Sequence, residues 1–478
     1  MTASRAIASA RPDPGRWRLR MPAAARLLRI ELRRSTMLVV LPLLAVLLGA
    51  TEIRNDLGHP PLWAVRSMDL QIQVELTGAI VAAVAAWVAT RDRRRHVTDL
   101  VLTSVRSQWS RQLTAWAAVT GWALVFYSAC VAVVYGVTAT QTKWGGPIWW
   151  LPAVGAAAIV AFSAVGFAVG SALPSRFTAP LVAIVALFAP QIGVVALQHR
   201  HPWGRVSFAE GATVPGTGTI VPFHAGLSIA QLLFLVGVAG VALGALALPR
   251  GAGGRRLRAV GAVATTLAVL TAGTGVALAD TARETTQGII IPALHAAADD
   301  RPLGAALVCD HSAVPICVHP AYQAMLPVLS AQIDPLLDEV AGLPGAPERV
   351  VIGSTTAAGS TAHAIVIGPE VLISLGVTFD TAPPDLRTNV AVRVIQAVVA
   401  PGRVGIGPAQ QAIAGALAQV MRLDVRDRES DSLVPAPGSP AAVAAQRFAA
   451  LPAATRHDWL MTHVEALRAG QITLAEIP

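Results

Sequence analysis

Two cysteines and two histidines lie within the segment 309–319, where they could do chemistry. Each cysteine begins a Cys-x-His unit, Cys309 with His311 and Cys317 with His319. Thiolate sulfur and imidazole nitrogen are preferred zinc ligands, so the four side chains could in principle hold a zinc ion. The two cysteines could instead form a disulfide or remain free thiols. The compartment that contains this segment decides between these alternatives, because disulfides persist in oxidising surroundings.

The rest of the chain offers no catalytic pattern. Lys143 is the only lysine, and no G-x-x-x-x-G-K-[ST] run is present, so the chain is not itself a P-loop ATPase. The helical segment 389–399 contains neither His nor Glu, which excludes a His-Glu-x-x-His zinc peptidase there. Ser354 and Ser360 do not lie in a Gly-x-Ser-x-Gly elbow. We therefore expect no enzyme activity, no cofactor and no metal site.

The composition indicates a membrane protein. Of the 478 residues, 54% are hydrophobic and only 14% are charged, whereas soluble domains carry about 25% charged residues. Residues 1–280 hold 25 basic and 10 acidic side chains, and residues 281–478 hold 12 basic and 18 acidic ones. The arginines of the first part flank apolar segments, which favours membrane topology over nucleic-acid binding as the reason for the positive charge. Two bodies in two environments are expected.

Apolar segments of the length of a membrane span recur along the first part. A bilayer core requires about 20 mostly apolar residues per helix. Seven segments qualify: 35–53, 74–90, 113–137, 149–171, 177–197, 224–248 and 259–279. They predict an α-helical polytopic membrane protein with four parts: a basic segment 1–34, a six-span domain 35–250, a basic loop with a seventh span 251–280, and a C-terminal domain 281–478.

The distribution of basic residues predicts the orientation. With a cytoplasmic N-terminus, the inside segments hold 20 basic residues and the short outside loops hold 5, as the positive-inside rule requires. The chain is then a multi-pass protein of the plasma membrane, and seven crossings leave residues 281–478 outside the cytoplasm. In that oxidising compartment a Cys309–Cys317 disulfide is favoured over zinc.

The C-terminal part has the patterns of a small α+β or mainly helical domain. Short apolar runs at 350–352 and 364–367 predict strands, and segments 388–400, 410–421, 440–450 and 455–469 predict helices.

Residues 22–34 predict an amphipathic helix before the first span. Leu28 and Leu32 lie on its apolar face, Arg26, Arg29 and Arg33 lie opposite, and Glu31 belongs to the same helix. A basic amphipathic helix of this kind lies in the plane of the lipid headgroups. The alternative is a basic anchor that only fixes the topology.

The loop that follows the second span predicts a second amphipathic helix. Val101, Val105 and Trp109 recur at helical spacing, Leu102 lies beside them, and Asp99 lies near the start, where the helix dipole favours an acid. An apolar stripe without a soluble core beside it usually contacts a partner. The alternative is a positively charged stop followed by a surface helix.

These two segments carry a resemblance to a known family. The run RLLRIELRRSTMLVVLPLLAV resembles the connecting helix and first span of type-2 ATP-binding-cassette (ABC) exporter permeases, and RDRRRHVTDLVLTSVRSQWSRQLTAW is similar to their coupling loop. Val97, Asp99 and Val105 stand where that loop usually has Gly, Glu and Pro. The resemblance covers about residues 22–250, and the seventh span and the outer domain are additions to it.

The resemblance implies a permease subunit of an export system. It implies a second permease copy or homologue and a cytoplasmic ABC ATPase that docks on Asp99, Val101, Leu102, Val105 and Trp109. The alternative is a membrane-anchored extracytoplasmic binding or sensing protein without transport activity.

Overall fold

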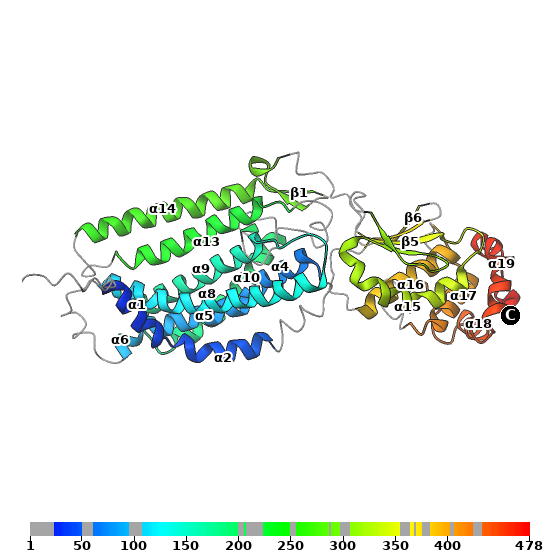
Figure 1. Cartoon of the computed structure of the whole chain (residues 1–478), viewed down its shortest axis with the longest axis horizontal. Helices are drawn as coiled ribbons and strands as arrows, with labels where there is room; N and C mark the ends of the chain where they lie inside the picture. The colour runs from blue at the N-terminus through cyan, green and yellow to red at the C-terminus, as the bar shows by residue number, and fades with distance from the viewer. Residues whose placement is uncertain are drawn as a thin grey trace, which may run out of the picture.

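The computed structural model describes most of the chain as two bodies joined end to end (Figure 1). One body is a bundle of long helices, and the other combines a β-sheet with helices. The residues described are 23–49, 61–94, 108–198, 205–206, 223–248, 255–285, 288–296, 306–353, 364–367, 370–374, 383–401, 406–423 and 433–478.

Apolar helices build the first body. In chain order they are α1 (Ala23–Arg33), α2 (Met37–Leu48), α4 (Trp63–Ile72), α5 (Val74–Ala89), α6 (Arg91–Arg94), α8 (Gln108–Gln141), α9 (Trp150–Ala172), α10 (Thr178–Gln198), α13 (Gly226–Ala245) and α14 (Arg255–Asp280). Five helical stretches in the described part are long and apolar enough to cross a membrane: Trp63–Ala89, Gln108–Gln141, Trp150–Ala172, Gly226–Ala245 and Arg258–Asp280. The protein is thus α-helical, with the helices of a membrane-embedded chain.

The helix lengths differ from the predicted spans. α4 and α5 run on as one stretch of 27 residues, so the second predicted span, 74–90, begins about ten residues too late. α8 has 34 residues and extends the predicted span 113–137 at both ends. Two other predicted spans, 35–53 and 177–197, correspond to the shorter apolar stretches Met37–Leu47 and Thr178–Ile192 in the described part. At about 1.5 Å per residue, the 12 residues of α2 are shorter than a bilayer core.

Small side chains set the spacing of the central helices. A Cβ atom on Gly166 of α9 would collide with the carbonyl oxygen of Ala82 on α5, and one on Gly170 would collide with that of Ala86. The backbones of α9 and α5 touch because Gly166 and Gly170 have no side chain. Small residues at the interface are the usual way for helices to associate closely in lipid. Around them packs a core that contains Val81, Tyr127, Ile159 and Phe167, all buried.

The second body follows the short hairpin β1 (Arg283–Thr285) and β2 (Gly288–Ile290). Its sheet has the order β3-β4-β5-β7-β6, with β4, β5 and β7 parallel and the edge strands β3 and β6 antiparallel to their neighbours. The strands are β3 (Val308–Cys309), β4 (Ile316–Val318), β5 (Arg349–Gly353), β6 (Ala364–Ile367) and β7 (Glu370–Ser374). The 310 helices are η2 (Pro292–Leu294), η4 (Pro320–Met325) and η5 (Leu474–Glu476), and the α-helices are α15 (Leu326–Val340), α16 (Pro383–Val399), α17 (Pro408–Val420), α18 (Pro440–Ala449) and α19 (Ala453–Ala469).

A buried ion pair ties two helices of this second body together. The guanidinium of Arg456 on α19 contacts the carboxylate of Glu339 on α15, with Nη2 3.2 Å from Oε2. Both residues are at most 7% exposed. Arg456 Nη1 also donates to the carbonyl oxygen of Ala449, at 3.1 Å. Burial of two charges is tolerated here because each charge has the other as its partner, and the guanidinium has further hydrogen bonds to backbone carbonyl oxygens.

The two ends of the bundle have different neighbours. Helices α1 and α6 lie at one end, and the sheet-containing body lies beyond the other (Figure 1). Leu62 and Val65, next to and within α4, belong to the same buried cluster as Ile316, Ile333 and Leu417 of the second body. The second body therefore packs directly on the bundle as well as being joined to it through the chain.

Candidate functional site

The amphipathic helix α1 is fixed to the bundle by two contacts. Arg91, just after α5, forms a two-pronged ion pair with Glu31, with Nη2–Oε1 and Nη1–Oε2 distances of 3.1 and 3.2 Å. Trp122 of α8 donates its indole N–H to the carbonyl oxygen of Leu32, at 2.9 Å. α1 is thus held both to α8 and to the segment that directly follows α5.

The side chains of α1 differ in their exposure. Arg26, Arg29 and Arg33 are exposed, whereas Leu28 and Leu32 are partly buried. The guanidinium groups are therefore available to an anionic surface, such as phospholipid headgroups.

The predicted docking helix is described only at its end. Asp99, Val101, Leu102 and Val105 lie outside the described residues. Trp109 is the second residue of the long helix α8. It is partly buried and donates its indole N–H to the carbonyl oxygen of Leu243 on α13 at 3.3 Å. Trp109 thus has a packing role within the bundle, which any test of a docking role has to separate from the docking itself.

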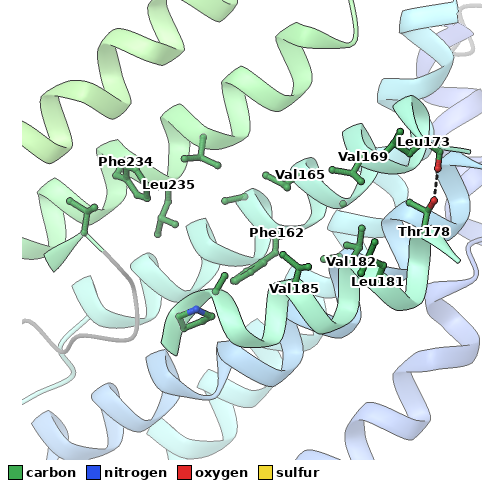
Figure 2. Close-up of a pocket in the computed structure, with 18 residues that line it drawn as sticks. Phe162, Val165, Val169, Leu173, Thr178, Leu181, Val182, Val185, Phe234 and Leu235 are labelled. Carbon is green, nitrogen blue, oxygen red and sulfur yellow. Dashed lines mark hydrogen bonds between the residues drawn. The ribbon is translucent and has the colours of Figure 1, made fainter. Parts of the chain in front are cut away.

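An apolar cavity of about 460 Å³ lies between the bundle helices. α9 and α10 supply most of its walls, α13 supplies Phe234 and Leu235, and α5 supplies Ala82 (Figure 2). Among the lining residues that the structure describes, only Thr178 has a polar side chain, and its hydroxyl donates to the carbonyl oxygen of Leu173. The described part of the cavity wall therefore presents no unsatisfied side-chain polar group to a ligand.

Polar side chains pair inside the bundle towards the second body. Arg66 of α4, 1% exposed, donates from Nη1 to the hydroxyl of Thr138 on α8 at 2.9 Å. Ser67 and Tyr135 share a hydrogen bond of 2.8 Å between their hydroxyls. These pairs satisfy groups that would be costly to leave alone in an apolar medium, and the sequence gives no sign of which residues pair.

The second body meets the bundle at an aromatic contact. The His319 ring, at the start of η4, lies edge-on to the Trp144 indole, with ring centroids 4.8 Å apart and an interplanar angle of 87°. His319 Nδ1 accepts a hydrogen bond from the backbone N–H of Ala321 at 3.2 Å. Burial lowers the pKa of His319, so the ring is neutral at pH 7. The Cys-x-His spacing makes His319 a possible zinc ligand, and nothing in that spacing indicates the contact with Trp144.

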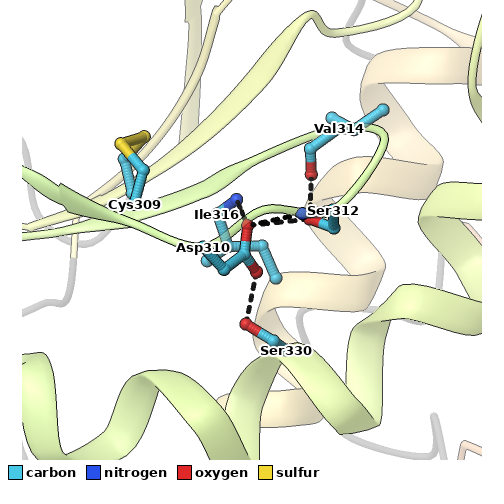
Figure 3. Close-up of a disulfide and its surroundings, with 7 residues drawn as sticks. Cys309, Asp310, Ser312, Val314, Ile316 and Ser330 are labelled. Carbon is cyan, nitrogen blue, oxygen red and sulfur yellow. Dashed lines mark hydrogen bonds between the residues drawn. A yellow bond between two sulfur atoms is a disulfide. The ribbon is translucent and has the colours of Figure 1, made fainter.

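The cysteines of the candidate zinc site are joined to each other. Cys309 and Cys317 form a disulfide between the paired strands β3 and β4, as predicted (Figure 3). His311 is exposed, and His319 faces Trp144. Among the described residues, no group of three or more His, Cys, Asp or Glu side chains is placed to hold a metal ion. The segment therefore has the geometry of a cross-linked hairpin.

Asp310 organises the turn that the disulfide closes. Its Oδ1 accepts hydrogen bonds from the Ile316 N–H at 2.8 Å and from the Ser312 hydroxyl at 2.8 Å, and its Oδ2 accepts from Ser330 on α15 (Figure 3). Burial alone would raise the pKa of Asp310, but these hydrogen bonds together lower it. The carboxylate thus anchors the hairpin to α15.

No known protein family, curated protein or solved structure matches this chain.

Proposed function

We propose that this chain is the membrane-spanning permease subunit of an ABC-type export system, energised by a separate ATPase subunit. The attachment of α1 carries the proposal. Glu31 and Leu32 connect this basic, amphipathic helix to Arg91 beyond α5 and to Trp122 on α8. A force applied to α1 from outside the bundle would reach the two long helices that flank its core.

The mechanism is indirect, because the chain has no P-loop of its own. Closure of the partner ATPases on ATP would displace α1 and the loop 91–112. α5 and α8 would then shift against α9 and α13, and the space between the helices would change its shape. In this scheme α1 and α6 lie on the cytoplasmic side of the plasma membrane, and the sheet-containing body lies outside. A second permease copy would complete the assembly.

A photo-crosslinking experiment in native membranes tests the docking step. A photoreactive amino acid replaces Val105 in one variant and Leu294, which is 44% exposed in η2 near the opposite end of the bundle, in the control. The proposal expects a P-loop ATPase crosslinked at position 105 and absent at position 294.

Val105→Asp provides the matched loss-of-binding variant. Trp109→Ala alone would not, since it also removes the hydrogen bond to Leu243 within the bundle. Val105→Asp would place a carboxylate in the apolar contact, which should weaken ATPase binding by about 2 kcal/mol or more and reduce copurification, while membrane insertion stays normal. Unchanged copurification with both variants, or crosslinks to lipid only, would favour an extracytoplasmic binding or sensing protein without transport activity.

A further inference from the structure

The cavity between α9, α10 and α13 combines an apolar lining with an opening at the bundle surface. Leu181 and Val185 on α10 line it and are 59% and 60% exposed, and Leu173 at the end of α9 is 62% exposed. Val185 lies near the middle of α10 (Thr178–Gln198). The opening therefore lies at the side of the bundle, at the depth of the apolar helices.

The inner wall of the cavity is formed by buried side chains. Leu235 on α13 and Ala161 on α9 are 6% and 4% exposed, and Ala186 on α10 is 7% exposed. Figure 2 shows Phe162 between the α10 residues Val182 and Val185 and the α13 residues Phe234 and Leu235. The volume of about 460 Å³ lies in the range of ligand-binding cavities.

The chemistry of the lining selects the ligand. The one polar side chain in the described lining, Thr178, already donates to the carbonyl oxygen of Leu173. A sugar, a peptide or an ion would lose its hydration in this cavity and gain no hydrogen bond from the side chains, at a high cost in free energy. A hydrocarbon chain has no hydration to lose and packs against the apolar lining. Five helices of the described part are long and apolar enough to cross a bilayer, and Thr178–Ile192 of α10 is a shorter apolar stretch, so in a bilayer the opening would face lipid chains.

We infer that this cavity is a binding site for an acyl chain of a membrane lipid, entered sideways from the bilayer between α9 and α10. The bound chain lies against Phe162 and Leu235, and the lipid headgroup stays outside the cavity. The inference does not require an ATPase partner, so its failure and the failure of the permease proposal can be told apart.

The test uses the full chain in lipid nanodiscs that contain a phosphatidylcholine with a diazirine in the middle of one acyl chain. After irradiation, labelled residues are mapped by mass spectrometry as the mole fraction of the probe is raised. A binding site saturates, whereas lipid that only touches the surface labels in proportion to the probe. We expect saturable adducts on Phe162 and Leu235, and proportional adducts on the exposed Phe188 of α10.

Two neighbouring substitutions separate the cavity from the surface. Val185→Phe places a large side chain at the opening, and Ile184→Phe places the same side chain on an adjacent residue that is 56% exposed and does not line the cavity. Labelling of Leu235 should fall about tenfold in Val185→Phe and stay unchanged in Ile184→Phe.

Three outcomes would overturn the inference. The first is labelling of Leu235 that rises in proportion to the probe, and the second is equal labelling of Leu235 in the two variants. The third is a disulfide between two copies of a Val185→Cys variant together with no lipid adduct, because a second copy of the chain would then cover the opening.

Discussion

His319 lies edge-on to Trp144, with 4.8 Å between the ring centroids, and this contact connects the two bodies of the protein. Trp144 follows the long helix α8, and His319 precedes η4 and α15. Trp144 also packs against the buried cluster that Leu62 and Val65 share with the sheet-containing body. The sheet-containing body thus packs against α4 and the end of α8, the two helices that carry the pairs Arg66–Thr138 and Ser67–Tyr135.

Trp144→Ala should weaken the packing of the sheet-containing body on the bundle. Removal of the indole takes away the aromatic contact and its share of apolar burial, which together are worth about 2 kcal/mol or more. Hydrogen exchange of the backbone amides of η4 should accelerate in the intact protein. Trp150→Ala, which removes an indole that is 42% exposed, serves as the control and should leave η4 unchanged. Equal exchange in wild type and Trp144→Ala would remove the contact from the account.

Because His319 is part of this contact, the stability of the packing between the two bodies depends on pH. Burial lowers the pKa of His319 below its ordinary value of 6.5, so the unfolded chain binds a proton more readily than the folded one. The contribution of His319 to the free energy of unfolding is therefore constant above about pH 6.5 and falls as the pH drops from there through the lowered pKa. His319→Gln should remove this part of the pH dependence, measured by thermal unfolding between pH 7.5 and pH 5 in steps of about half a unit. If the unfolding temperature depends on pH equally in wild type and His319→Gln over that window, the prediction is wrong.

The disulfide Cys309–Cys317 leaves Cys130 as the free cysteine. A thiol reagent added to unfolded, unreduced protein should therefore modify Cys130 alone, and after reduction it should modify all three cysteines. By the chain-entropy relation, a loop this short contributes about 2–3 kcal/mol of stability, so reduction should lower the unfolding temperature. Modification of three cysteines before reduction would exclude the disulfide.

Glu339→Ala should be among the most damaging substitutions in the sheet-containing body. It leaves the buried guanidinium of Arg456 without its counter-charge, a change that costs about 3–5 kcal/mol. Glu348→Ala removes an exposed carboxylate nearby and should cost less than about 0.5 kcal/mol. The resistance of α15 and α19 to a protease, measured against temperature, compares the two variants. Similar curves for both would mean that the ion pair contributes nothing.

How much of this arrangement the sequence predicts depends on the kind of interaction. Hydropathy locates α9 and α13 because they contain no charged residue and few polar ones, but it misses α4, where Arg66, Asp69 and Gln71 lower the average. Arg66 is nevertheless buried, because Thr138 on another helix accepts its hydrogen bond, and a window along one segment contains no information about that partner.

The candidate sites divide in the same way. The Cys309–Cys317 disulfide follows from local spacing and the expected compartment, and it is confirmed. The Trp144–His319 contact joins residues far apart in the chain, and no periodicity indicates it. The cavity is equally invisible in the sequence, since Val185 lines it and the neighbouring Ile184 does not, although both are exposed and β-branched. The hydrogen bond from Trp109 to Leu243 also depends on a distant helix.

The permease proposal also fixes a topology that a reporter can read. Seven crossings would place Pro478 outside the cytoplasm and the segment after Arg94 inside it. A fluorescent protein that matures only in the cytoplasm should be dark when fused after Pro478. A phosphatase that is active only outside should be active in the same position. The opposite pair of results would imply an even number of crossings.

ATP hydrolysis by the purified assembly tests the permease proposal most directly. The tagged chain is isolated from its own membrane, reconstituted in lipid nanodiscs, and assayed with Mg²⁺-ATP, with and without vanadate. The account predicts vanadate-sensitive hydrolysis carried by a copurified P-loop subunit, and a loss of both from the Val105→Asp chain. The contradicting result is a folded wild-type chain, shown by its protease-resistant sheet-containing body, that copurifies with no P-loop subunit. Its ATP hydrolysis would then be no greater than that of Val105→Asp.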